Sequence, residues 1–137
     1  MRELLFVCVH NAGRSQMAEA FTNSLAKVKM LPVHARSAGA AAGDEINPMV
    51  AAVMEEIGIS LEGQRPRQLT QELADNANLI ISMGCGIYAD ACPARIHVTE
   101  DWGLEDPKGQ PIEKVRAIRD EIKAKIELLL TELGGSR

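Results

Sequence analysis

Aromatic side chains are scarce in this chain of 137 residues, where Phe6, Phe21, Tyr88 and Trp102 are the whole set. A cleft for an aromatic ligand would therefore have few aromatic side chains to line it. Long apolar runs are also missing, because Leu4–Val9 is too short to cross a bilayer. A polar loop follows it in place of a small-residue cleavage site, so no signal peptide is expected and we predict a cytoplasmic protein.

Positive charge is in short supply as well, and the net charge is −4. That balance argues against a general nucleic-acid or membrane-surface binder, so any anion affinity must come from a local site. Only three cysteines occur, an odd number in a chain without an export signal. A structural disulfide framework is not expected, and reactive thiols are favoured.

The hydrophobic pattern alternates between strands and helices and predicts one α/β domain over residues 1–137. Short apolar strands are expected over residues 2–8, 33–37, 79–81 and 96–98. Helical spacing predicts helices over 15–28, from Pro48 to a stop at Gly58, over 70–75, and from Ile112 to Leu133. Such alternation implies a parallel sheet of four strands covered by helices, a doubly wound, flavodoxin-like arrangement. Ligands of such sheets bind beyond the carboxyl ends of the strands.

The first strand leads into the most informative loop, which begins at Cys8 and reaches Arg14 after five residues. Its members are Cys8, Val9, His10, Asn11, Ala12, Gly13, Arg14 and Ser15. Backbone N–H groups of such a loop and the N-terminus of the next helix both favour an anion at one point. Arg14 adds a planar two-pronged donor. The same positive field stabilises a thiolate, so Cys8 is the candidate nucleophile and residues 9–15 the oxyanion-binding loop.

Each of these residues also has a plainer interpretation. Cys8 could be a buried structural thiol, since free cysteine is among the most buried residues, and Arg14 could form a surface salt bridge. Ser15 could donate to the Cys8 thiolate, cap the helix, or do both. His10 could contact the ligand or bond the backbone of its own loop, and His34 and His97 are expected to be structural.

Cys85 and Cys92 form a second unusual feature, seven residues apart after the third strand. They could be unrelated, or could bind a metal with His97 or Cys8, but the spacing lacks the close pairs of zinc sites and we predict no metal. A redox role is favoured. Seven helical residues rise about 10.5 Å, whereas a disulfide needs Cα atoms within about 7 Å, so a helix there would have to unwind.

Asp106 follows the fourth predicted strand and precedes Pro107. It should lie at the same sheet edge as Cys8 and Cys85, where it could act as a general acid that protonates a leaving oxygen. The alternative is a turn aspartate before the last helix. Glu105 and Asp101 are weaker candidates for the acid.

The run Cys8–Glu19, the Ser37-Ala38-Gly39 segment, the Cys85/Cys92 pair and Asp106-Pro107 together resemble the thioredoxin-coupled arsenate reductases. That family shares the fold of the low-molecular-weight protein tyrosine phosphatases. The loop marks the superfamily, and the cysteine pair marks the reductase branch. The resemblance covers nearly the whole chain.

The resemblance implies a mechanism. Cys8 attacks arsenate, Arg14 and the loop amides hold its oxygens, and Asp106 protonates the departing hydroxyl. Cys85 then attacks the Cys8 adduct and releases arsenite, and Cys92 closes a Cys85–Cys92 disulfide that thioredoxin reduces. Two thiols supply the electrons, so no bound cofactor is implied; phosphate and sulfate are implied as further oxyanion ligands.

Two departures accompany this resemblance. The best-known reductases carry a second cysteine inside the loop where this chain has Gly13. Some members also bind potassium through residues that match Asn11, Glu19 and Ser37. The carboxylate that completes their site is replaced near Arg67, which argues against a potassium requirement and makes Arg67 a candidate for supplying the positive charge.

Two other functions remain open at this point. A low-molecular-weight tyrosine phosphatase would use Cys8, Arg14 and Asp106 equally well, although Lys108-Gly109 follows Asp106-Pro107 without a tyrosine to wall a phenyl pocket. A non-catalytic oxyanion-binding or thiol redox-sensing module would bind sulfate or phosphate without turnover.

Overall fold

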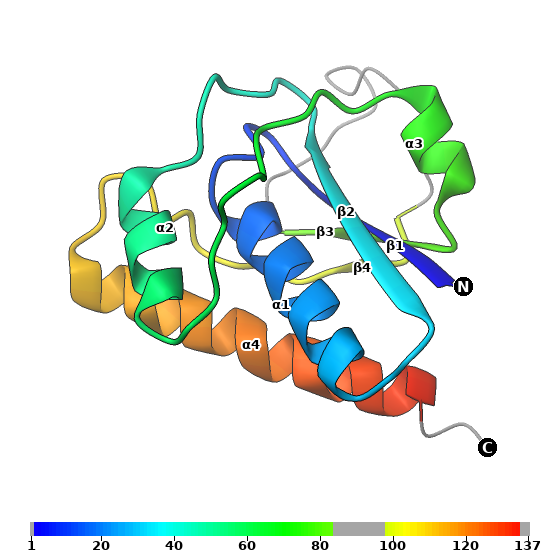
Figure 1. Ribbon diagram of the computed structural model, residues 1–137. Coiled ribbons are helices and arrows are strands. Elements are labelled where there is room, and N and C mark those ends of the chain that lie inside the picture. Colours follow the sequence, from blue (N-terminus) through cyan, green and yellow to red (C-terminus); the bar gives the residue numbers. More distant parts are fainter. Residues whose placement is uncertain (1, 84–97, 135–137) are drawn as a thin grey trace.

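The computed structural model describes residues 2–83 and 98–134 of the chain. Within them, helices pack around one parallel sheet whose strand order is β2-β1-β3-β4 (Figure 1). The strands are β1 (Arg2–Cys8), β2 (Val33–Gly39), β3 (Leu79–Ser82) and β4 (Glu100–Asp101). The helices are α1 (Arg14–Val28), α2 (Pro48–Glu55), α3 (Gln71–Asn76) and α4 (Ile112–Gly134). The predicted α/β fold with a four-stranded parallel sheet is confirmed.

The side-chain alternation of β1 divides the core into two layers. Leu4, Phe6 and Cys8 pack into the larger hydrophobic cluster, with residues of α1, α2 and α4. Leu5 and Val7 point to the other face, into the cluster that contains Ala74 of α3. Helices therefore cover both faces of the sheet, with α1 and α4 on one side and α3 on the other (Figure 1).

Local signals explain where the helices begin. The Asn47 side chain accepts a hydrogen bond from Met49 N at 2.9 Å, and Pro48 occupies the first helical position of α2. The helix α2 ends at Glu55, and a turn then carries the chain to Gly58, whose φ is +80°. The predicted stop at Gly58 is thus a few residues beyond the helix itself, because the intervening residues form a turn.

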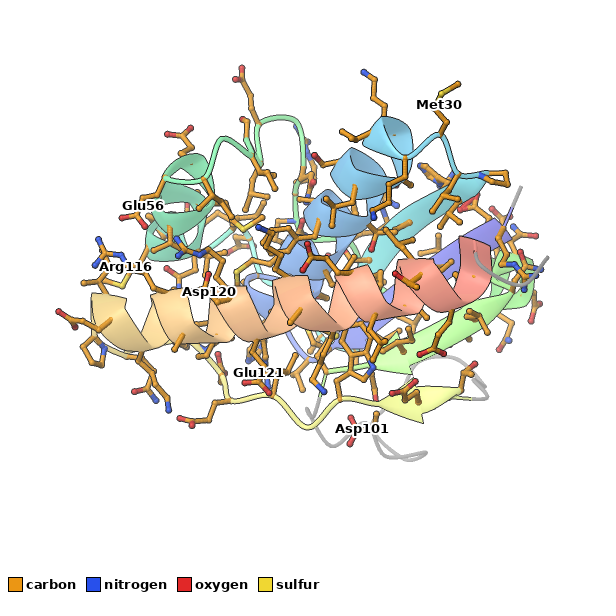
Figure 2. The ribbon with its side chains drawn as sticks, turned by 90° about the horizontal axis from the view of Figure 1, so that it is seen from below. Met30, Glu56, Asp101, Arg116, Asp120 and Glu121 are labelled. Carbon is orange, nitrogen blue, oxygen red and sulfur yellow. The ribbon has the colours of Figure 1, made fainter. Side chains whose placement is uncertain are left out.

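Helix α4 is joined to α2 by ion pairs at its N-terminal end. Arg116 lies 2.7 Å from Glu56 and Arg119 lies 2.9 Å from it, and Figure 2 shows Glu56, Arg116 and Asp120 together at that end of the long helix. Arg119 is buried and also donates to the Val53 carbonyl at 2.9 Å. No helix within residues 2–83 and 98–134 is both long and apolar enough to cross a membrane.

The fourth strand was predicted in the wrong place. Val98 lies outside any strand, and Ile96 and His97 lie outside the described residues. Strand β4 is Glu100–Asp101 instead, both exposed and paired with Ile81 and Ser82. The prediction failed because a two-residue edge strand is set by its hydrogen bonds to β3 and needs no apolar run.

Glycine is required where β2 ends. Gly39 pairs with Cys8, and a Cβ at Gly39 would lie 2.5 Å from the Val9 carbonyl oxygen and 3.0 Å from Asn11 N. The loop that follows Cys8 therefore rests directly on the backbone of β2. This close approach positions the candidate site against the carboxyl edge of the sheet.

Candidate active site

Cys8 ends β1 as a buried thiol, only 3% exposed, at the floor of the loop. Its Sγ accepts a hydrogen bond from Asn11 N at 3.1 Å and lies 2.8 Å from Ser15 Oγ. The Asn11 backbone adopts a left-handed conformation, with φ of +54°, which turns its N–H inward to the sulfur. Donors directed at a sulfur stabilise the thiolate, the reactive form of cysteine.

Helix α1 begins at Arg14, one residue before the predicted start. Its N-cap is Gly13, and no side chain caps the first turn. A Cβ at Gly13 would lie 3.0 Å from Pro107 Cγ, so the helix N-terminus lies against the loop that carries Asp106. The uncapped N–H groups of this turn favour an anion.

Arg14 is held in place by two backbone carbonyls. Its Nη1 donates to Leu104 O at 2.8 Å and to Met83 O at 3.2 Å. These carbonyls lie just after β4 and β3, and the side chain is 10% exposed. Anchoring of Nη1 restricts the orientation of the guanidinium, which pre-organises it as an oxyanion donor.

Asp106 lies on the far side of the same site. Its Oδ2 is 3.8 Å from Arg14 Nη2, and its Oδ1 accepts from Lys108 N at 3.0 Å in a turn. Asp106 is therefore a turn residue, as one interpretation predicts, and its other carboxylate oxygen faces Arg14; its role as a general acid stays a prediction. Glu105 and Asp101 have other partners, Lys114 at 2.8 Å and Ser82 at 2.7 Å.

These groups line one open cavity of about 590 Å³. Cys8, Arg14 and Asp106 share it, and Asp44, Glu45 and Lys108 stand among its lining residues. A tetrahedral oxyanion would fill only a part of this volume. The arrangement can bind such an anion next to a nucleophilic sulfur, with a carboxyl group available for proton transfer.

The family model of the low molecular weight phosphotyrosine protein phosphatases matches residues 3–137. The chain belongs to this phosphatase family. Among curated relatives, the glutaredoxin arsenate reductase of Synechocystis is 34% identical over 134 residues, which covers 97% of this chain and 99% of the relative.

Two solved structures of arsenate reductases have folds similar to that of this chain. An arsenate reductase in the phosphate-binding state superposes with a TM-score of 0.82 at 35% identity, covering 96% of this chain and 98% of that one. The thioredoxin-dependent arsenate reductase of Corynebacterium glutamicum gives a TM-score of 0.80 at 34% identity, covering 100% of this chain and 64% of that one.

The residues predicted for a cation site are only partly brought together in this phosphatase-family fold. Ser37 Oγ donates to Glu19 Oε1 at 2.6 Å. Burial raises the pKa of Glu19, while the Ser37 hydrogen bond and the charge of Arg67 act in the opposite direction. The Asn11 carboxamide oxygen instead accepts from Arg67 N at 2.8 Å and from Gln16 Nε2 at 2.9 Å.

The other predicted residues fall into two groups. His10 Nδ1 lies 3.2 Å from Ala41 O, and His34 Nδ1 lies 2.7 Å from Glu3 Oε1, so both contact neighbours within the fold. Cys85, Cys92 and His97 lie outside the described residues. No group of three or more metal-ligating side chains occurs within residues 2–83 and 98–134.

Sequence reasoning missed two glutamines behind the loop. Gln16 is fully buried and contacts Asn11, and Gln64 contacts Gln16. The only available signal was a polar residue in a helix directly after Ser15, and polar residues in the first turn of a helix are too common to single one out.

Proposed function

We propose that the protein reduces arsenate to arsenite. The observation that carries the proposal is the one cavity that Cys8, the anchored Arg14 and Asp106 line together. The names of the full-length relatives, a glutaredoxin arsenate reductase and a thioredoxin-dependent arsenate reductase, support the same chemistry.

In the first step the Cys8 thiolate attacks arsenic. Arg14 and the N–H groups of residues 9–15 hold the arsenate oxygens, and Asp106 gives a proton to the departing hydroxyl, which leaves as water. The product is a covalent Cys8–arsenic(V) adduct. Pre-organised hydrogen bonds aimed at the oxyanion are the main source of stabilisation in such a step.

In the second step the Cys85 thiolate attacks the Cys8 sulfur. The sulfur–arsenic bond breaks, its electron pair stays on arsenic, and arsenite leaves as arsenic(III). Cys8 and Cys85 are then joined by a disulfide. Cys92 attacks Cys85, which frees the Cys8 thiolate and leaves a Cys85–Cys92 disulfide. The two thiols thus provide the two electrons that arsenic gains.

Thioredoxin is the proposed external reductant of this disulfide, in the cytoplasm, and no bound cofactor is part of the scheme. The direct experiment is arsenate-dependent NADPH oxidation with thioredoxin and thioredoxin reductase. A parallel assay with glutaredoxin, glutathione and glutathione reductase identifies the reductant. Absence of arsenate-dependent oxidation in both assays would contradict the proposed reaction.

Phosphomonoester hydrolysis is the second candidate function. The family and the cavity volume both favour it, because the space beyond the oxyanion could hold a leaving group. No aromatic side chain of the described residues lines this cavity, which disfavours phosphotyrosine and leaves small phosphoesters as substrates. Release of p-nitrophenol from its phosphate at a rate far above arsenate reduction would favour this function. Sulfate binding without either activity would favour the non-catalytic module.

A further inference from the structure

A chain of buried polar side chains extends from Cys8 to the segment before α3. Asn11, Ser15 and Gln16 are all fully buried. Asn11 Nδ2 lies 2.7 Å from Ser15 Oγ, Gln16 Nε2 lies 2.9 Å from Asn11 Oδ1, and Gln64 Nε2 lies 2.7 Å from Gln16 Oε1. Buried polar groups of this kind are costly unless they are fully paired.

Backbone groups fix the direction of the carboxamide hydrogen bonds in this chain. The Arg67 N–H can only donate, so the Asn11 atom that it contacts at 2.8 Å is the carboxamide oxygen. The Asn11 amide nitrogen therefore faces Ser15 and donates to its hydroxyl oxygen. A thiolate can only accept, so for ionised Cys8 the Ser15 hydroxyl hydrogen is directed to the sulfur, 2.8 Å away.

The orientation of Gln16 follows from the same rule. The carbonyl oxygens of Asn11 and Arg65 can only accept, and they lie 2.9 and 3.0 Å from Gln16 Nε2. Gln16 Oε1 therefore faces Gln64, whose Nε2 donates both to this oxygen and to the Gln16 carbonyl at 3.2 Å. The Gln16 amide thus donates to both the carbonyl oxygen and the side-chain oxygen of Asn11.

These hydrogen bonds hold Asn11, whose backbone is in the left-handed region. A non-glycine residue stays in the left-handed region only when its surroundings hold it there, although asparagine tolerates that region better than most residues. Asn11 needs that conformation to direct its N–H to the Cys8 sulfur at 3.1 Å. Release of Gln16 would allow Asn11 to relax, and both donors on the sulfur, the Asn11 N–H and the Ser15 hydroxyl, would be weakened together.

We propose that Gln16 and Gln64 are positioning residues for the Cys8 nucleophile, which hold Asn11 so that two hydrogen-bond donors point at the sulfur. The inference rests on the proposed role of Cys8 as the nucleophile. Neither glutamine touches the substrate in this scheme; both act through Asn11 and Ser15. The other ionisable side chains that line the cavity with Cys8, among them Arg14, His10 and Asp106, are unchanged by substitution of either glutamine.

The test measures the reactivity of Cys8 without arsenate. In a Cys85→Ser/Cys92→Ser background Cys8 is the only thiol, since the chain has three cysteines. The rate of alkylation by iodoacetamide is measured against pH for this parent and for Gln16→Met and Gln64→Met. We expect the alkylation midpoint to move to higher pH, by about one unit for Gln16→Met, a tenfold change in the thiolate equilibrium, and by less for Gln64→Met.

Gln68 offers a matched control on the same segment. Its side chain bonds Ala40 and Ala42, at 2.8 and 3.0 Å, and neither bond is part of the chain to Cys8. Gln68→Met should leave the midpoint at the parental value. Gln64→Lys keeps a donor for Gln16, so its midpoint should return most of the way to the parental value. Gln68→Lys reports the effect of the added charge alone.

A merely structural role would lower the melting temperature and leave the alkylation midpoint unchanged. A parental midpoint in folded Gln16→Met protein would overturn the proposal, and Gln64→Met decides it if Gln16→Met does not fold. The proposal would also be overturned if the midpoint fell by the same amount from Gln68→Met to Gln68→Lys as from Gln64→Met to Gln64→Lys, because the added charge alone would then explain the recovery. Because alkylation needs no arsenate, failure of the proposed reduction would leave this result interpretable.

Discussion

Arg14 Nη2 lies 3.8 Å from Asp106 Oδ2, and this contact connects the first residue of α1 with the loop before α4. The arginine cannot move freely toward the carboxylate, because its Nη1 is held by the Leu104 and Met83 carbonyls. A tetrahedral anion bound by Arg14 would thus have the carboxyl of Asp106 close to one of its oxygens.

Cys8→Ser should abolish arsenate reduction and keep the fold. A serine hydroxyl is not ionised at neutral pH, and the substitution is nearly isosteric at this buried position. The measurement is arsenate turnover together with a thermal unfolding curve. Retention of more than roughly a few per cent of turnover would show that Cys8 is not the attacking group.

Asp106→Asn should lower turnover by roughly 10²–10⁴, the range for a positioned general acid. Sulfate binding, followed by calorimetry, should change little because Arg14 and the loop amides remain. Glu105→Gln is the matched control, since Glu105 pairs with Lys114, and it should keep near-parental turnover. Equal losses in both variants would remove the acid role from Asp106.

Cys92→Ser should permit one round of arsenite release and then stop. Cys8 and Cys85 still supply two electrons, but the resulting Cys8–Cys85 disulfide should be a poor substrate for thioredoxin. Peptide mapping after a single turnover identifies the bridge in the variant and the Cys85–Cys92 bridge in the unchanged protein. A product of the unchanged protein linked only through Cys8 would contradict the proposed order of attack.

Added potassium should leave the melting temperature and activity nearly unchanged. The Asn11 side-chain oxygen already accepts two hydrogen bonds, and Glu19 lies within the field of Arg67. Ligands that bind only the folded state raise its stability by mass action. A rise of several degrees that sodium does not reproduce would show that Asn11, Glu19 and Ser37 hold the cation.

Glu19→Gln should change the pH dependence of stability. Burial raises the pKa of Glu19 above 4.5 in the folded protein, so the folded state binds the proton more tightly than the unfolded state. Its contribution to stability is therefore complete below about 4.5 and is lost as pH rises through the folded pKa. The variant keeps the oxygen that accepts from Ser37 but cannot titrate.

Urea unfolding at pH 4 and pH 7 measures this difference. Relative to the Gln variant, the unchanged protein should be more stable at pH 4 than at pH 7. A difference between the two proteins that is the same at both pH values would show that Glu19 does not titrate across this range.

The sequence alone determined the class of fold and predicted the chemistry of the first loop. Cys8, Arg14 and the apolar strand before them predict a thiolate beside an oxyanion pocket, because spacing along a strand–loop–helix unit is a local property. The apolar patterns of β1, β3 and α4 are likewise present in the structure, since the two strands are buried on both faces of the sheet and α4 is buried along one face. The third-strand and last-helix predictions needed no long-range information.

Only the tertiary structure decided how that loop is held. Strand β4 is an exposed pair of residues that its hydrogen bonds to β3 define, so no apolar pattern marks it. Arg14 is oriented by carbonyls of Met83 and Leu104, and carbonyls are common to every residue. Gln16 and Gln64 meet because α1 and the segment before α3 pack together, and a pairing across that much of the chain depends on the closure of the whole fold.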